Sequence, residues 1–141
     1  MALNRGVAFP PESTKKSSPP RRVLVVDDEG LIRWSLAESL SEEGATVVEA
    51  SNGSEALRSV TDSAPDVVVL DFRMPDSNDL TLLASIRRLA PRSQVILMTA
   101  FDTPEIVAGA LDLGAFCVVS KPFEMGQLVA LVRQAHASAQ E

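Results

Sequence analysis

Hydrophobic and polar positions form two alternating patterns from residue 21 onward. Short runs of aliphatic and β-branched residues predict five strands, at 23–26, 46–48, 67–70, 95–98 and 116–119. Apolar residues at helical spacing predict a helix after each strand, at about 30–43, 53–63, 79–90, 103–113 and 123–138. This alternation predicts a (βα)5 domain, an α/β fold with a doubly wound, five-stranded parallel sheet and helices on both faces.

Residues that favour helix boundaries support this division of the chain. Gly44 and Gly114 follow the first and fourth predicted helices, and Pro91 ends the third. Thr103 and Pro104 open the fourth as a capping residue and a proline at the first helical position. The near-continuous apolar strands agree with a parallel sheet, because its central strands are buried on both sides.

The first residues of the chain have a different composition. Residues 1–20 hold four prolines and a cluster of Ser, Thr and Lys without apolar periodicity, which predicts a disordered leader. We expect one folded domain at 21–138, followed by a short tail at 139–141. Its core must be aliphatic, because the chain has five Phe, one Trp and no Tyr.

Charge and cysteine content limit the cellular location and the classes of binding partner that we expect. Of 13 Lys and Arg and 19 Asp and Glu, five basic residues and one acidic residue fall in 1–22, so the rest of the chain is strongly acidic. Such a body is poorly suited to direct nucleic-acid binding. The sequence has no apolar run typical of a signal peptide or a membrane span, and its one cysteine cannot form an internal disulfide. We expect a cytoplasmic protein that binds neither nucleic acid nor membrane directly.

Polar residues follow four of the predicted strands at the edge where a doubly wound sheet binds its ligand. Asp27 and Asp28 follow the first strand, Asp71 the third, Thr99 the fourth and Lys121 the fifth. Clustered carboxylates raise one another's pKa unless a positive charge holds them. A hard cation such as Mg²⁺, for which Mn²⁺ could substitute, takes such oxygen ligands and phosphate as well.

The same residues suit phosphoryl chemistry. Asp27, Asp28 and Asp71, with a main-chain carbonyl near Arg73, would hold the metal. Asp71 could then accept a phosphoryl group as a nucleophile. Lys121 and Thr99 would bind the phosphoryl oxygens.

Four sequence elements together resemble the receiver domain of bacterial two-component response regulators, over about residues 21–138. They are the Asp pair at 27–28, D-x-x-M-P at 71–75, M-T-A at 98–100 and K-P-F at 121–123. The run LIRWSL after the acidic loop, together with MTAF and GAF, is most similar to the receivers of nitrogen-regulation-type activators.

The resemblance implies a signalling switch rather than an enzyme with turnover beyond its own phosphorylation and dephosphorylation. A sensor histidine kinase or phosphotransfer protein would phosphorylate Asp71, and Ala100 would join Thr99 and Lys121 in the phosphoryl-binding set. It also implies a flavodoxin-like strand order 2-1-3-4-5. The surface of helix 4, strand 5 and helix 5 would change on phosphorylation and bind a downstream protein or effector domain, or a second copy as a homodimer.

Two positions depart from the family pattern. The aromatic residue usual three positions before the lysine is Val118 here, and strand parity predicts that Phe116 shares its face. The coupling of threonine to a moving aromatic ring is therefore open, with both residues as candidates for the switch face. Asp79 replaces the usual glycine, either at a positive φ or, as we favour, as a cap of the third helix.

Two further positions bear on how fast the phosphoaspartate is hydrolysed. In this family, the residues two after the aspartate and two after the threonine flank the attacking water, and here they are Arg73 and Phe101. We hypothesise that this bulky pair slows hydrolysis of the phosphoaspartate.

Other functions remain as alternatives. A receiver-like module could bind a partner without phosphorylation, which Val118 leaves open. A phosphoaspartate hydrolase of the haloacid dehalogenase type would carry an acid where Arg73 stands, and a nucleotide-binding protein would show a glycine-rich loop after the first strand. The predicted leader at 1–20 mildly favours a free-standing receiver over part of a longer activator. The kinase, the output partner and the oligomeric state are left open at this point.

Overall fold

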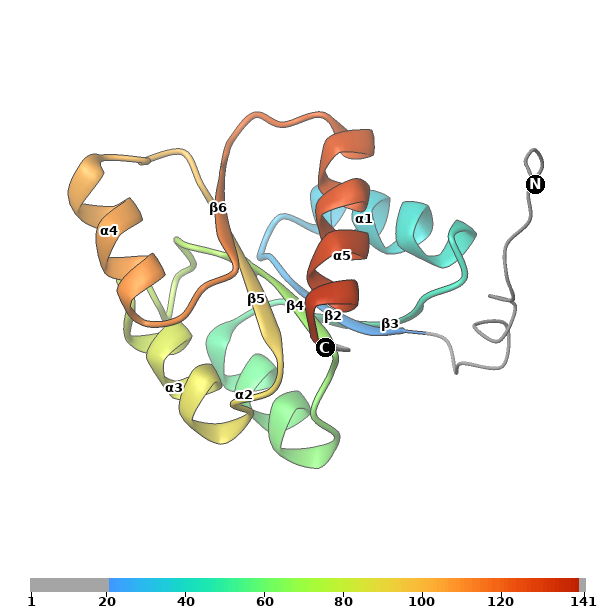
Figure 1. Cartoon of the computed structure of the whole chain (residues 1–141), viewed down its shortest axis with the longest axis horizontal. Helices are drawn as coiled ribbons and strands as arrows, with labels where there is room; N and C mark the ends of the chain where they lie inside the picture. The colour runs from blue at the N-terminus through green and yellow to red at the C-terminus, as the bar shows by residue number, and fades with distance from the viewer. Residues whose placement is uncertain (1–20, 140–141) are drawn as a thin grey trace, which may run out of the picture.

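The computed structural model describes residues 21–139, which form a five-stranded parallel sheet flanked by five helices (Figure 1). The strands are β2 (Arg22–Val26), β3 (Thr46–Ala50), β4 (Val67–Asp71), β5 (Gln94–Thr99) and β6 (Cys117–Ser120). The helices are α1 (Gly30–Glu42), α2 (Gly53–Asp62), α3 (Thr81–Leu89), α4 (Pro104–Asp112) and α5 (Met125–Ala139). The predicted disordered leader lies outside the described residues.

The sheet has the order β3-β2-β4-β5-β6, with all neighbours parallel. In chain order this is 2-1-3-4-5, which confirms the predicted doubly wound fold. The strand order changes direction at β2, between β3 and β4, so the loops after β2 and β4 lie beside the switch point.

Helices cover both faces of the sheet (Figure 1), and a hydrophobic core lies between the sheet and the helices on each face. Side chains of α2, α3 and α4, such as Ala56, Ile86 and Ala110, pack on one face. Side chains of α1 and α5, such as Leu36 and Leu128, pack on the other. Each strand contributes alternate residues to the two cores, as the pleat requires.

Element bounds differ from the predicted ones mostly by one or two residues, as is usual at frayed ends. The last strand begins at Cys117 rather than at 116, and α5 continues to Ala139, one residue into the predicted tail. The rest of that tail is outside the described residues. None of the helices within 21–139 is long and apolar enough to cross a membrane.

The predicted face of Phe116 is wrong. Phe116 precedes β6 and packs with the α1 and α5 core, whereas Val118 packs with the α2, α3 and α4 core. Phe116 lies outside the regular strand, so strand parity does not apply to it. It therefore cannot replace the missing aromatic residue on the face of Val118.

Asp79 does not adopt a positive φ, since every described residue with a positive φ is a glycine. Its carboxylate accepts a hydrogen bond of 2.9 Å from the Thr81 N–H, the first residue of α3. This bond also keeps the pKa of Asp79 below its usual value. Asp79 thus caps α3 in effect, but from one residue before Leu80, the residue at the N-cap position.

Candidate phosphoryl-accepting site

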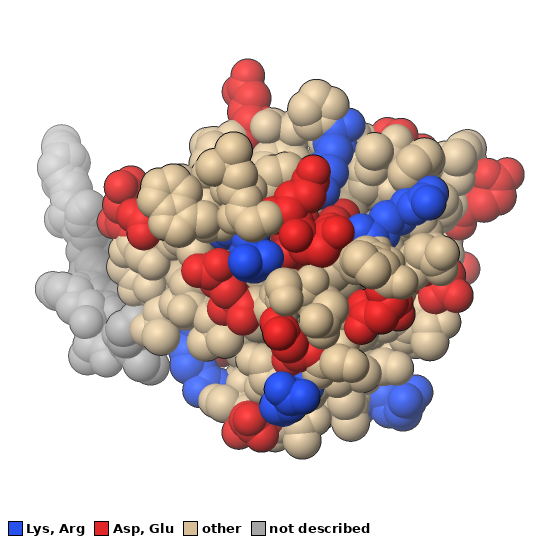
Figure 2. Space-filling view, turned by 180° about the vertical axis from the view of Figure 1, so that it is seen from behind, with Lys and Arg blue, Asp and Glu red and all other residues tan. Residues whose placement is uncertain are grey.

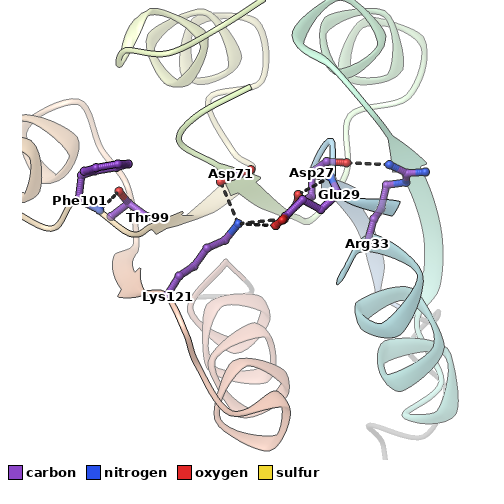
Figure 3. A network of polar contacts seen from close by, with 7 residues as sticks. All are labelled: Asp27, Glu29, Arg33, Asp71, Thr99, Phe101 and Lys121. Atoms are coloured by element: carbon purple, nitrogen blue, oxygen red, sulfur yellow. Dashed lines mark hydrogen bonds and ion pairs between the residues drawn. The ribbon is translucent and has the colours of Figure 1, made fainter. Parts of the chain in front are cut away.

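Strand parity explains which side chains meet at the carboxyl edge of the sheet. Asp27, Asp71 and Lys121 continue the alternation of the strand residues that face α1 and α5, whereas Thr99 continues the other set. Lys121 accordingly reaches both carboxylates, with its Nζ 3.3 Å from Asp27 Oδ2 and 3.2 Å from Asp71 Oδ1 (Figure 3). Thr99 stands apart from this ion pair.

Asp27 is fully buried and held at three atoms. Its Oδ1 accepts a 2.9 Å hydrogen bond from the Glu29 N–H, while Oδ2 pairs with Lys121. Its main-chain carbonyl accepts a 2.7 Å hydrogen bond from Arg33 Nη1 (Figure 3). A buried charge requires this degree of pairing, because desolvation otherwise costs several kcal/mol.

Three carboxylates are positioned to share one cation. Asp27, Asp28 and Asp71 each offer an oxygen, and these atoms lie within 4.8 Å of one another. Asp27 and Asp71 are buried and Asp28 is exposed, so a metal would be reached from solvent on the Asp28 side. The set is all oxygen, as Mg²⁺ prefers, and Lys121 with one positive charge does not neutralise it.

Burial is the largest influence on Asp71. Burial and the adjacent charge of Asp27 raise the pKa of Asp71 to about 6, against the lowering effect of Lys121. For Lys121, burial alone would lower the pKa, but the charges of Asp71 and Asp27 outweigh it and raise the pKa above its usual value. Lys121 therefore stays positively charged. Its single charge does not balance the negative charge of the aspartates around it.

A hollow of about 310 Å³ opens over Asp71. It is lined by Asp28, Glu29, Asp71, Phe72, Arg73, Thr99, Ala100, Phe101 and Lys121. The structure thus brings together the predicted metal and phosphoryl-binding side chains, and buried Asp27 joins them through its contact with Lys121. Phe116 and Val118 are absent from this lining.

Thr99 and Phe101 form one side of the hollow (Figure 3). The Thr99 Oγ1 accepts a 2.8 Å hydrogen bond from the Phe101 N–H. A hydroxyl carries one donor and two acceptor positions, so this bond leaves the Thr99 O–H able to donate to an incoming oxygen. The guanidinium of Arg73 lies over the Phe101 ring, 4.6 Å from its centroid, and the two side chains form a bulky wall beside Asp71.

Two residues that contact the site, Arg33 and Glu29, were not among the predicted site residues. Arg33 joins the acidic loop to the edge strand, because its Nε also pairs with Glu49 at 3.0 Å. Glu29 adds a third carboxylate to Lys121, at 3.7 Å. An arginine that binds a main-chain carbonyl belongs to no spacing motif, so no signal in the sequence indicates it.

Acidic side chains also gather toward the middle of the face in Figure 2, with basic side chains beside them and no broad basic patch on that face. That face therefore has no general positive field to attract an anion, and the cation nearest to Asp71 is Lys121.

The fold and this acid site define a receiver domain. The model of the response regulator receiver domain family matches residues 23–133, so the chain belongs to that family. This confirms the resemblance seen in the sequence. Receiver domains are in general signalling modules of two-component systems rather than enzymes.

Two similar regulatory proteins are longer than this chain. The DNA-binding transcriptional regulator NtrC of Escherichia coli K12 is 40% identical over 119 residues, which cover 84% of this chain and 25% of NtrC. The transcriptional regulatory protein PdtaR of Mycobacterium tuberculosis H37Rv is 37% identical over 128 residues, which cover 89% of this chain and 61% of PdtaR. The chain thus spans about a quarter and about three fifths of these two relatives.

Solved receiver domains have the same fold over their whole length. A CheY-like receiver domain protein from Methanospirillum hungatei JF-1 superimposes with a TM-score of 0.82 at 25% identity, covering 86% of this chain and 97% of that one. The receiver domain of NtrX from Brucella abortus superimposes with a TM-score of 0.75 at 32% identity, covering 82% and 98%.

The raised pKa of Asp71 predicts a stability effect in metal-free protein. The folded chain holds the Asp71 proton more tightly than the unfolded chain, where the pKa is near 3.8. This contribution to stability is complete below about pH 4 and is lost as the pH rises through about 6. Asp71→Asn should therefore gain stability relative to wild type across that window. Urea unfolding with a chelator at several pH values measures it, and a difference between the two proteins that does not change with pH would contradict the assignment.

Proposed function

We propose that the protein is a phosphorylation-dependent switch in which Asp71 accepts a phosphoryl group from a histidine kinase or phosphotransfer protein, with Mg²⁺ bound beside it. The observation that carries the proposal is the pairing of buried Asp71 with Lys121 next to two further carboxylates. This arrangement offers one nucleophile, one fixed cation and one metal site within a single hollow.

The residues divide the work of the transfer. A carboxylate oxygen of Asp71 would attack phosphorus as the bond from phosphorus to the donor's imidazole nitrogen breaks, and the electron pair stays on that nitrogen. Lys121 would pair with one phosphoryl oxygen, and the Thr99 hydroxyl would donate to another. Mg²⁺ when bound supplies electrostatic stabilisation of the phosphoryl oxygens. Asp27, Asp28, Asp71 and the Arg73 main-chain carbonyl would hold it, and Mn²⁺ would serve in its place.

The output would pass through the loop between β5 and α4. The Phe101 N–H bond to Thr99 anchors one end of this loop, and a short hydrogen bond from Ser120 Oγ to Asp102 anchors it to the end of β6. Recruitment of Thr99 to a phosphoryl group would disturb the first contact and so shift α4. This route does not need an aromatic ring at Val118, and it leads to the surface formed by α4, β6 and α5.

We further propose that this surface binds a downstream protein, an effector domain or a second copy of the chain. Exposed Leu111 near the end of α4 offers apolar contact area for any of them. We propose a cytoplasmic location for the switch, with which a single, half-buried cysteine is compatible.

The phosphoryl donor would dock on α1. Leu31 and Trp34 are 76% and 56% exposed at the start of this helix. Neighbouring large apolar side chains that are this exposed are typical of an interaction surface. Leu31 also lines a groove of about 480 Å³, which shares Lys121 and Ala100 with the hollow over Asp71. An apolar helix face seated there would bring a phosphohistidine to the acceptor.

Intact mass measurement after incubation with acetyl phosphate and Mg²⁺ tests the acceptor. Wild type should gain one phosphoryl group, because acetyl phosphate supplies the group without a protein donor. Asp71→Asn and metal-free wild type should gain none. If wild type stays unlabelled while another receiver domain labels in parallel, the protein is instead a module that binds its partner without phosphorylation.

Trp34→Ala tests the docking surface. Transfer from a phosphorylated histidine phosphotransfer protein should slow by about ten- to thirtyfold, the usual loss for a central aromatic contact. Labelling by acetyl phosphate should be unchanged, because that donor is too small to use α1. Leu89→Ala on α3, where Leu89 is 50% exposed, is the matched control and should transfer normally. Equal rates for the two variants would count against docking on α1.

Replacement of both Arg73 and Phe101 by alanine should shorten the lifetime of the phosphoaspartate several-fold. The two side chains stack beside Asp71, so their removal opens a path for water. Decay of the phosphorylated protein, followed by intact mass, measures the lifetime. Arg88→Ala, which removes an exposed arginine of α3, is the control. An unchanged or longer lifetime in the double variant would refute the role of this pair.

A further inference from the structure

The first turn of α2 is capped from two different parts of the chain. Asn52 at the N-cap position accepts a 2.9 Å hydrogen bond from the Glu55 N–H. Asp76, from the loop that follows Asp71, accepts hydrogen bonds from the N–H groups of Gly53 at 2.9 Å and Ser54 at 3.3 Å. The first N–H groups of a helix have no partner within the helix and carry partial positive charge, so a carboxylate is well matched to them.

Gly53 allows this approach. It is buried, and a Cβ at this position would lie 3.3 Å from Asp76 Oδ1 and 3.5 Å from Leu82 Cδ2. The contact between the loop and α2 is therefore close-packed as well as hydrogen-bonded.

The loop that carries Asp76 is also the loop that carries the Arg73 carbonyl. Met74 and Ser77 exchange two main-chain hydrogen bonds, of 2.8 and 3.0 Å, and close a tight turn around Asp76. Met74 is buried in the core, and the Phe72 N–H donates to the Met98 carbonyl at 2.8 Å. The short segment from Asp71 to Asp76 is thus held by hydrogen bonds at both ends, to β5 near Asp71 and to α2 at Asp76.

The start of α2 is in turn tied to the acidic loop. The Asp27 N–H donates a 3.1 Å hydrogen bond to the carbonyl of Ala50, three residues before Gly53. A continuous set of contacts therefore runs from Asp27 through the end of β3 and the start of α2 to Asp76, and back along the loop to Arg73. It joins the two parts of the chain that would supply the metal ligands.

We infer that Asp76 is a positioning residue for the metal site: by fixing the loop after β4 to the N-terminus of α2, it sets the position of the segment that carries the Arg73 carbonyl relative to the acidic loop of Asp27. The inference rests on the proposed Mg²⁺-dependent function. Asp76 itself need not contact the metal, because it acts through the backbone of its loop.

Mg²⁺ titration of the full chain, followed by amide chemical shifts in nuclear magnetic resonance spectra, tests this role in four proteins. They are wild type, Asp76→Ala, Asp76→Asn and Asn52→Ala. Asp76→Ala should raise the Mg²⁺ dissociation constant about tenfold, as losses of supporting contacts around metal ligands do. Asn52→Ala weakens the same helix end without touching the loop, and it should bind Mg²⁺ as wild type does.

Asp76→Asn separates positioning from charge. Its amide oxygen can keep the shorter bond, from the Gly53 N–H, but not the one from Ser54. Positioning therefore predicts a clearly smaller rise in the dissociation constant than with alanine, whereas a purely electrostatic effect predicts the full loss seen with alanine. Hydrogen exchange in the metal-free proteins supplies a second readout, and amides 72–79 should exchange faster in Asp76→Ala only. Should Asp76→Ala not fold, Gly53→Ala, which crowds the same contact, takes its place with the same expectation.

The outcomes separate this inference from the function beneath it. Equal Mg²⁺ affinity in Asp76→Ala and Asn52→Ala, or a loss in Asp76→Asn as large as in Asp76→Ala, would overturn the positioning role while leaving the metal site intact. Absence of any Mg²⁺-dependent shift in wild type would overturn the proposed function itself.

Discussion

The structure depends on one ionic contact, the lysine shared by two buried carboxylates. Lys121 reaches the Oδ atoms of Asp27 and Asp71 at 3.3 and 3.2 Å across the end of the sheet. Without it, two like charges would be enclosed with no counter-ion, which is strongly destabilising. With it alone, the site still carries excess negative charge, so the folded domain is prepared for a further cation. Burial of the acidic cluster destabilises the folded domain, and a bound cation would offset that destabilisation.

The fold could be predicted from the sequence because its elements are locally encoded. Each strand is a continuous apolar run, and each helix repeats apolar residues on one face, so their order and type follow from periodicity. The convergence of Asp27, Asp28, Asp71, Thr99 and Lys121 followed from one rule, that parallel strands end at the same edge. Contacts between distant side chains and main-chain groups were not predictable, since neither Arg33 on the Asp27 carbonyl nor Asp76 on α2 leaves a spacing pattern. Phe116 was misplaced because the last strand begins one residue later than its β-branched run suggested.

The sheet also separates two halves of the site. Asp27, Asp71 and Lys121 belong to the alternation that faces α1 and α5, while Thr99 and Val118 belong to the one that faces α2, α3 and α4. A group attached to Asp71 would contact both sets at the edge of the sheet, where no strand lies between them. In the proposed switch, Thr99 would be the residue through which a change on the first side reaches the second. With valine at 118, the loop from Ala100 to Thr103 would carry this connection without an aromatic ring.

The exposed indole of α1 has a practical consequence. Trp34 is the only tryptophan of the chain, and it is 56% exposed on α1, about one turn after the acidic loop. Indole emission depends on solvent contact, so any molecule that covers this part of α1 will change the colour and intensity of the emitted light. The protein therefore carries an intrinsic optical reporter at the surface next to its acid site, and binding there can be followed on the unmodified chain.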